Sequence, residues 1–172
     1  ARRLVRLSGR HPLSLRLLAR QLSRPGMSLE SLCKEATENL MKVLTDPLAD
    51  DDEKDRQKKV ELSYALSYRH LSASAQRLFQ RLSFMPGGIV CGGLWEHLLD
   101  WSKLLGDDWR TLMEKELDYF ALVHFEPGGG NQGTFEILSP MREFARKQYE
   151  HQADACWERK WLAFWQDRLA LW

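Results

Sequence analysis

Four consecutive acidic side chains at residues 50–53, Asp-Asp-Asp-Glu, are of a type that binds metal ions. Carboxylate oxygens are the ligands that Ca²⁺ and Mg²⁺ prefer in proteins. Metal-binding loops, however, space their acidic ligands at intervals and include a glycine, so four adjacent acids do not converge on one ion. We interpret the run as a solvated linker or as the start of a helix, because acidic side chains are favourable at the positive end of a helix.

A glycine-rich run at residues 127–133, PGGGNQG, raises the question of phosphate binding. A P-loop reads G-x-x-x-x-G-K with Ser or Thr next, so that backbone amides and the lysine surround phosphates at the start of a helix. This run contains no lysine and leads into an alternating segment typical of a strand. We therefore interpret it as the flexible tip of a β-hairpin wing.

The sequence patterns of common catalytic sites are missing. There is no nucleophile elbow, no H-E-x-x-H and no acid pair on one predicted face, so we expect no enzymatic activity and no metal site. The three cysteines, Cys33, Cys91 and Cys156, are far apart and form no C-x-x-C pair. Together with the lack of a secretory signal, this indicates a reducing cytoplasm in which each cysteine is a small apolar side chain.

Composition limits the partners that the chain attracts through charge or hydrophobicity alone. Of 172 residues, 44% are hydrophobic and 28% charged, which suits one good core or two small ones. Lys and Arg number 25 against 24 Asp and Glu, a formal charge of +1, so no overall field draws the protein to nucleic acid or to a membrane. No apolar run approaches the roughly 20 residues that span a bilayer.

The elements that would position any site are mostly helical in the first half of the chain. Within residues 4–22, Gly9 ends one helix and Pro12 starts the next. Ser28 begins a third helix, a fourth reaches Tyr68, and after a turn at Leu71 the residue Ser72 is placed to cap a fifth. The run at residues 86–88, Pro-Gly-Gly, stops that fifth helix.

In the second half, short strands join the helices. Residues 89–90 pair briefly as a strand, residues 94–101 form a short helix, and Asp107 or Asp108 caps a helix running to residue 120. Extended segments at 121–126 and 134–138 flank the glycine-rich run and predict a β-hairpin, followed by a helix that Ser139 caps. The fold class we expect is mainly α: a helical-bundle domain followed by a winged-helix domain with a short β-hairpin wing.

The corner at residues 66–87 resembles the junction between the helical and winged-helix domains of NB-ARC-type signalling ATPases of the STAND class. The residues that carry the resemblance are Leu66-Ser67-Tyr68, Leu71-Ser72, Arg77-Leu78-Phe79-Gln80-Arg81-Leu82 and Phe84-Met85-Pro86-Gly87. A plain helix-turn-helix corner in any all-α domain is the alternative reading of the same residues.

Two further segments resemble nucleotide-contacting motifs of the same family. The run Gly9-Arg10-His11-Pro12-Leu13-Ser14-Leu15 is similar to Gly-x-Pro-Leu-Ala-Leu, whose proline packs on the adenine ring, although Gly9 stands three residues before Pro12 rather than two. Leu138-Ser139-Pro140 occupies the place of the family's apolar-His-Asp segment, whose histidine reaches the β-phosphate of ADP. The resemblance thus implies cofactor contacts from His11, Pro12 and Ser139. A helix start at Pro12 and an N-cap at Ser139 are the structural alternatives.

The resemblance also implies a domain order. We expect a helical domain with an acidic linker at residues 1–58, a winged-helix domain at 59–150, and the start of a C-terminal helical region at 151–172. Ala1 opens in mid-pattern without a cap, so we expect a piece of a longer protein, with a P-loop NTPase domain upstream and sensor repeats downstream. ADP or ATP would bind only together with that upstream domain, and the chain would relay nucleotide state as a switch.

Two other functions stay open. A winged-helix transcription factor would need a basic recognition helix and wing, but residues 109–118 carry a mixed, rather acidic set and the wing has no Lys or Arg, so DNA binding is not expected. A non-catalytic scaffold would instead associate with a second copy through an aromatic ridge after residue 156. The members of this ridge are Trp157, Trp161, Phe164, Trp165, Leu169 and Trp172.

Overall fold

A computed structural model describes residues 2–42, 44, 53–84, 89–90, 109–128 and 133–150, together with Arg159, Leu162, Ala163, Trp165 and Gln166 in the C-terminal stretch. The predicted stop at 86–88, the predicted helix at 94–101, the caps Asp107 and Asp108, the acids at 50–52, the centre of the glycine-rich run, most of the aromatic ridge, and the cysteines Cys91 and Cys156 lie outside these residues.

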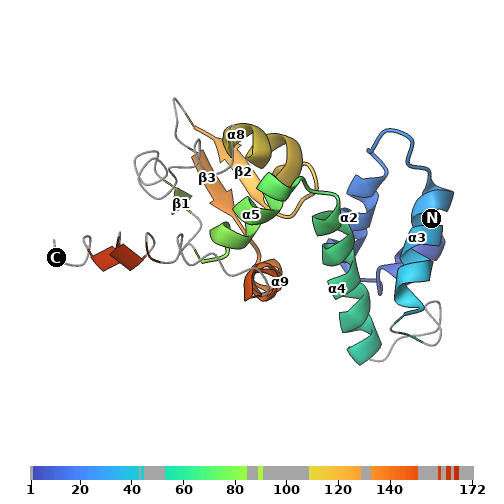
Figure 1. The fold of residues 1–172 in the computed structure, drawn as a ribbon. Helices are drawn as coiled ribbons and strands as arrows, with labels where there is room; N and C mark the ends of the chain where they lie inside the picture. Colours follow the sequence, from blue (N-terminus) through green and yellow to red (C-terminus); the bar gives the residue numbers. More distant parts are fainter. Residues whose placement is uncertain are drawn as a thin grey trace.

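The described chain is mainly helical, and its first part is a helical bundle drawn to the right in Figure 1. Its helices are α1 (Arg2–Leu7), α2 (Pro12–Gln21), α3 (Leu29–Leu40) and α4 (Glu53–Arg69). Ser28 caps α3, as predicted, because its hydroxyl accepts a hydrogen bond from the Ser31 amide at 3.0 Å. The α4 helix begins at the last residue of the acidic run, with Glu53 and Asp55 in its first turn.

The turn between α1 and α2 depends on a glycine. Gly9 has φ +63°, its amide bonds to the Arg6 carbonyl at 3.0 Å, and the Arg10 amide bonds to the Val5 carbonyl at 3.1 Å. This is the paired hydrogen bonding of a Schellman helix end, in which a left-handed residue satisfies the last carbonyls. A methyl group at Gly9 would lie 3.1 Å from Cγ of Arg56 in α4, so the turn itself packs closely against α4.

The second part is a winged helix, drawn to the left in Figure 1. It consists of α5 (Ala73–Leu82), β1 (Ile89–Val90), α8 (Trp109–Leu112), η1 (Met113–Asp118), β2 (His124–Pro127), β3 (Gly133–Glu136) and α9 (Ser139–Glu150). The hairpin β2–β3 and the brief strand at residues 89–90 are as predicted. The three strands form an antiparallel sheet in the order β1-β3-β2.

The helix predicted from residue 109 to 120 differs in its winding. Only α8 is α-helical, and η1 continues it as a wider π-helix. It ends in a turn whose left-handed position holds Ala121, at φ +57°, with the Leu122 amide bonded to the Leu117 carbonyl at 3.0 Å. The chain then enters β2, which starts at His124 rather than at the predicted residue 121.

Among the described residues, the interior consists of two apolar clusters that share α2 and α4. The bundle cluster takes Leu18 from α2 and Leu66 from α4, whereas the wing cluster takes Leu17 from α2 and Tyr64 from α4. Helix α4 forms a wall of both clusters. It also runs without a break through residues 58 and 59, the predicted boundary between the two domains. The domain division at that point stays a prediction.

Polar side chains cross the buried interface between α2 and α4. The hydroxyl oxygens of Ser14 and Ser63 are 2.8 Å apart, and Nε2 of Gln21 donates to the Ser67 hydroxyl at 3.0 Å. All four side chains are buried, so these bonds satisfy groups that would otherwise be costly to keep from water. The short serines at these sites also let the two helices approach closely.

Candidate functional site

The residues matched to a nucleotide motif lie at the start of α2. Pro12 is exposed and occupies the first turn of α2, where its missing amide hydrogen costs nothing. His11 is the N-cap residue in extended conformation, and its carbonyl accepts the Leu15 amide at 3.0 Å. This placement fits the structural reading of Pro12 as a helix starter and leaves its ring available on the surface.

The imidazole of His11 makes no side-chain cap. Its Nδ1 atom is buried and has no hydrogen-bond partner among the described residues. A buried polar atom without a partner costs free energy, which a ligand or a packed domain that supplies a partner would recover. His11 therefore presents an unused hydrogen-bonding atom directly beside Pro12.

Ser139 opens α9, on the far side of the hairpin. The side chain is exposed, and the first helical bond of α9 runs from the Arg142 amide to the Leu138 carbonyl at 2.9 Å. Ser139 is thus the first helical residue, one position inside the cap that the sequence predicts. Its hydroxyl makes no hydrogen bond within the described part of the chain, and it faces solvent.

A cavity of about 190 Å³ connects the two segments. Leu13, which follows Pro12, lines it from α2, and Leu138, which precedes Ser139, lines it from the other side. The turn around Ala121 and the buried Met141 complete its apolar walls. His11, Pro12 and Ser139 are not lining residues themselves, so the structure brings together their neighbours and not the three side chains.

Polar side chains reach this cavity from three elements. Arg16 lies one turn after Pro12 on α2 and makes no ion pair with the described residues, whereas Glu136 comes from the end of β3. His124 lies at the start of β2 between two carboxylates, with Nδ1 3.4 Å from Asp118 and Nε2 3.4 Å from Glu126. A guanidinium without an internal partner is well suited to bind a phosphate or carboxylate of a ligand.

The cavity is too small for a whole nucleotide. Drug-sized ligands occupy pockets of roughly 300–1,000 Å³, compared with the 190 Å³ found here. The arrangement can therefore provide one wall of a site, with an apolar surface and a guanidinium, but it cannot enclose a nucleotide.

The sequence identified the two segments but missed the charged side chains between them. Arg16 carried a usable signal, because position i+4 from Pro12 lies on the same face of a helix. Glu136 and His124 gave no comparable signal, since their approach to α2 depends on how the hairpin folds back on the bundle.

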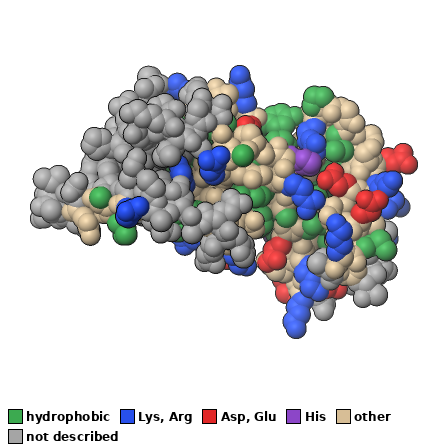
Figure 2. Space-filling model, viewed as in Figure 1, with side chains coloured by type: hydrophobic (Ala, Val, Ile, Leu, Met, Phe, Trp, Pro, Cys, Tyr) green, Lys and Arg blue, Asp and Glu red, His purple; other side chains and the backbone are tan. Residues whose placement is uncertain are grey.

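Surface charge does not single out one binding face. On the face shown in Figure 2, blue Lys and Arg side chains and red Asp and Glu side chains are interspersed over the helical bundle. Within the described ranges, no helix is long and apolar enough to cross a bilayer. Comparison with protein-family models, with curated proteins and with solved structures finds no match for this chain.

Proposed function

We propose that this chain is the helical and winged-helix portion of an NB-ARC-type STAND ATPase, and that it closes over ADP held mainly by a P-loop domain. The chain itself carries out no catalytic step. It contributes adenine packing from Pro12 and polar contacts from His11, Arg16 and Ser139, and it relays the identity of the nucleotide as a change in its position against the P-loop domain.

One observation supports this proposal above the others: the segment after His11 and the segment before Ser139 line the same cavity. The two motifs were singled out independently, about 125 residues apart in the chain, and they have no local reason to meet. The small volume of the cavity agrees with a chain that supplies only one wall. The Arg16 guanidinium, which makes no ion pair with the described residues, supplies a binding group at the cavity itself. The buried Nδ1 of His11, without a partner among the described residues, supplies a second group once the domains close.

The mechanism is a shift of population between a closed and an open arrangement of the domains. A nucleotide can shift this equilibrium only by the difference between its affinities for the two arrangements. Contacts from α2 and from the start of α9 exist only in the closed arrangement, so they provide that difference for ADP. Because α4 packs on α2 and also on α9, movement at either contact is transmitted to the whole chain.

The DNA-binding alternative is weakened by what the charged groups of α8 and η1 already bind. The Arg110 guanidinium donates to the Gly128 carbonyl at 3.0 Å and lies 3.5 Å from Glu114. Glu116 accepts hydrogen bonds from Ser72, and Asp118 accepts the Phe125 amide at 3.2 Å. A recognition helix needs side chains that are free to reach base edges. Of the four charged side chains named here, Glu114, Glu116 and Asp118 are acidic and would repel phosphate.

The test is a titration with fluorescently labelled ADP. It uses this chain and a chain extended N-terminally by the P-loop domain that the proposal requires. We expect binding by the longer chain only, with affinity lowered about tenfold by Pro12→Ala and by Arg16→Ala, since each removes roughly 1.4 kcal/mol of contact. Pro127→Ala, at an exposed proline at the end of β2, is the matched control and leaves the affinity unchanged.

Unchanged ADP affinity in both the Pro12→Ala and the Arg16→Ala variant of the longer chain would overturn the proposal. Salt-sensitive retardation of duplex DNA by the present chain would support the transcription-factor alternative instead, because phosphate contacts weaken steeply with salt.

A further inference from the structure

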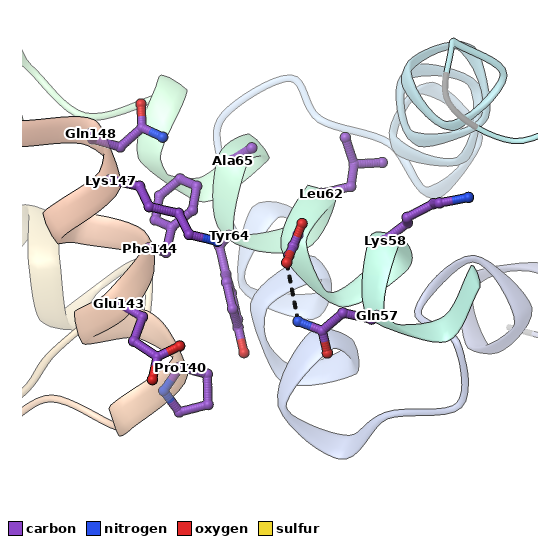
Figure 3. Close-up of a pocket in the computed structure, with 11 residues that line it drawn as sticks. Gln57, Lys58, Leu62, Tyr64, Ala65, Pro140, Glu143, Phe144, Lys147 and Gln148 are labelled. Atoms are coloured by element: carbon purple, nitrogen blue, oxygen red, sulfur yellow. Dashed lines mark hydrogen bonds between the residues drawn. The ribbon is translucent and has the colours of Figure 1, made fainter. Parts of the chain in front are cut away.

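A second, larger cavity lies between α4 and α9, and Pro140, the residue after Ser139, is one of its lining residues. It has a volume of about 340 Å³, within the range of small-molecule sites. Figure 3 shows its two walls, with Leu62, Tyr64 and Ala65 projecting from α4 and Pro140, Phe144 and Gln148 from α9. Neither His11 nor Pro12 belongs to it, and the inference below does not depend on nucleotide binding.

The base of this cavity is aromatic and apolar. Tyr64 is only 1% exposed, and its ring meets the ring of Phe144 edge to face, with centroids 5.9 Å apart and planes at 62°. Ala65 and Leu62, both half-buried, leave the space beside these rings open. Flat apolar ligands gain stability from offset or edge-to-face contact with such rings, in addition to the burial of their surface.

One polar atom at the base has no bonding partner. The Tyr64 hydroxyl is buried and makes no hydrogen bond with any described residue. Figure 3 shows it at the end of the ring that extends from α4 toward Pro140. Burial, and to a lesser degree the charge of Glu61, raises the pKa of this hydroxyl, so it keeps its proton and is available as a donor. A buried tyrosine hydroxyl usually has a partner, and a ligand oxygen would supply one.

The charges around the opening balance. Lys58 and Lys147 oppose Glu61 and Glu143, and all four side chains are exposed. Internal contacts already involve Lys58, whose Nζ lies 3.1 Å from Asp55, and Glu61, which accepts from Gln57 at 3.1 Å. An ion of either sign therefore meets two attractive and two repulsive groups, and it would also lose its hydration on entering an apolar space.

We propose that the cavity between α4 and α9 binds an uncharged compound of one or two aromatic rings that carries a single hydroxyl or carbonyl oxygen. The rings lie against Tyr64 and Phe144, and the oxygen accepts a hydrogen bond from the Tyr64 hydroxyl. Because α4 and α9 form opposite walls, the bound compound fixes the spacing of these helices.

Calorimetric titration of the 172-residue chain with 2-naphthol tests the proposal. We expect a Kd on the order of 0.1 mM, in line with a ligand of this size. Tyr64→Phe keeps the ring and removes only the donor, so it weakens binding about five- to tenfold. The anionic analogue 2-naphthoate, which has the same ring system, binds at least tenfold more weakly because its carboxylate must be desolvated.

Two matched substitutions locate the bound ring. Ala65→Phe fills the cavity from α4 and abolishes binding of 2-naphthol, whereas Ala19→Phe, at an exposed position of α2 outside the cavity, leaves it unchanged. Amide shifts of Tyr64, Ala65 and Phe144 in the ¹H–¹⁵N spectrum of the unsubstituted chain give the same information if Ala65→Phe does not fold. No saturable binding below about 5 mM, unchanged binding in Tyr64→Phe, tighter binding of 2-naphthoate, or amide shifts confined to other elements would each overturn the proposal.

Discussion

Glu116 of η1 accepts two hydrogen bonds from Ser72, one from the backbone amide at 2.7 Å and one from the hydroxyl at 2.8 Å. The same hydroxyl accepts the Ala75 amide at 3.2 Å and so caps α5. A residue 44 positions away in sequence thereby orients the cap of α5 and joins η1 to the corner between α4 and α5.

This relationship predicts a destabilised Glu116→Ala variant. Loss of the carboxylate frees the Ser72 amide and the orientation of its hydroxyl, and we expect the free energy of unfolding to fall by about 1–2 kcal/mol. Glu114→Ala is the control, since among the described residues Glu114 makes only a surface ion pair with Arg110, and its loss should cost less than about 0.5 kcal/mol. Urea denaturation followed by circular dichroism measures both, and equal losses would mean that Glu116 contributes no more than a surface charge.

The two left-handed glycines of the bundle predict unequal costs for the same substitution. Gly26→Ala, where a methyl group meets nothing within 4 Å, should lose about 1 kcal/mol from φ +78° alone. Gly9→Ala adds contacts at 3.1 Å with Cγ of Arg56 and at 3.4 Å with Cβ of Lys59, and should lose at least about 1 kcal/mol more. Denaturant midpoints of the two variants test this difference. A Gly9→Ala variant as stable as Gly26→Ala would show that Arg56 and Lys59 of α4 shift to accommodate the methyl group at little cost.

Ala121 predicts a substitution of the opposite sign. At φ +57° an alanine costs about 1 kcal/mol relative to glycine, so Ala121→Gly should stabilise the fold by up to about 1 kcal/mol, less the burial lost with its methyl group. Ala19→Gly, at an exposed position in the last turn of α2, should destabilise by up to a similar amount. Thermal unfolding of the pair gives the signs directly, and a loss of stability in both variants would contradict the strain at Ala121.

His70 predicts that stability falls in mild acid. Burial lowers the pKa of His70, with Arg24 and Arg69 adding to the effect and Glu35, 3.6 Å away, opposing it. Since the folded pKa lies below the unfolded value of about 6.5, the unfolded chain binds more protons in this window. The contribution of His70 is thus complete above that value and declines as pH falls through it. His70→Gln should flatten the decline between pH 7 and pH 5, measured by urea denaturation at each pH. Stability between pH 7 and pH 8, where His70 changes its protonation little in either the folded or the unfolded chain, is the control. If the stability of His70→Gln declines between pH 7 and pH 5 with the same slope as that of the unsubstituted chain, the decline belongs to other groups.

Local chemistry explains which parts of the fold were predictable. Ser28, Ser72 and Pro12 act through atoms within three or four residues, so their roles at helix starts follow from sequence alone. The β2–β3 hairpin was recognisable from alternation on both sides of a glycine-rich run.

What could not be predicted depends on contacts between distant segments. The apolar positions Met113 and Leu117 fit an α-helix and a π-helix equally well, so the winding of η1 was not visible. The cavity beside Arg16 exists only after the wing has packed on the bundle, and the bond from Ser72 to Glu116 forms only after η1 has packed against α5. The burial of the Tyr64 hydroxyl, without a partner among the described residues, likewise depends on packing between distant segments. For the same reason, a pattern of residues could suggest Pro12 and Ser139 but not that their neighbours share one cavity.

The position of α4 as a wall of both apolar clusters has a consequence for cooperativity. Val60 and Tyr64 belong to one cluster and Leu66 to the other, on a single uninterrupted helix. Loosening either half exposes apolar surface in the other, so heat should melt bundle and wing in one calorimetric transition. Cleaving the polypeptide after residue 58 would divide α4, and the first piece would then lack Leu66, which packs in its apolar cluster.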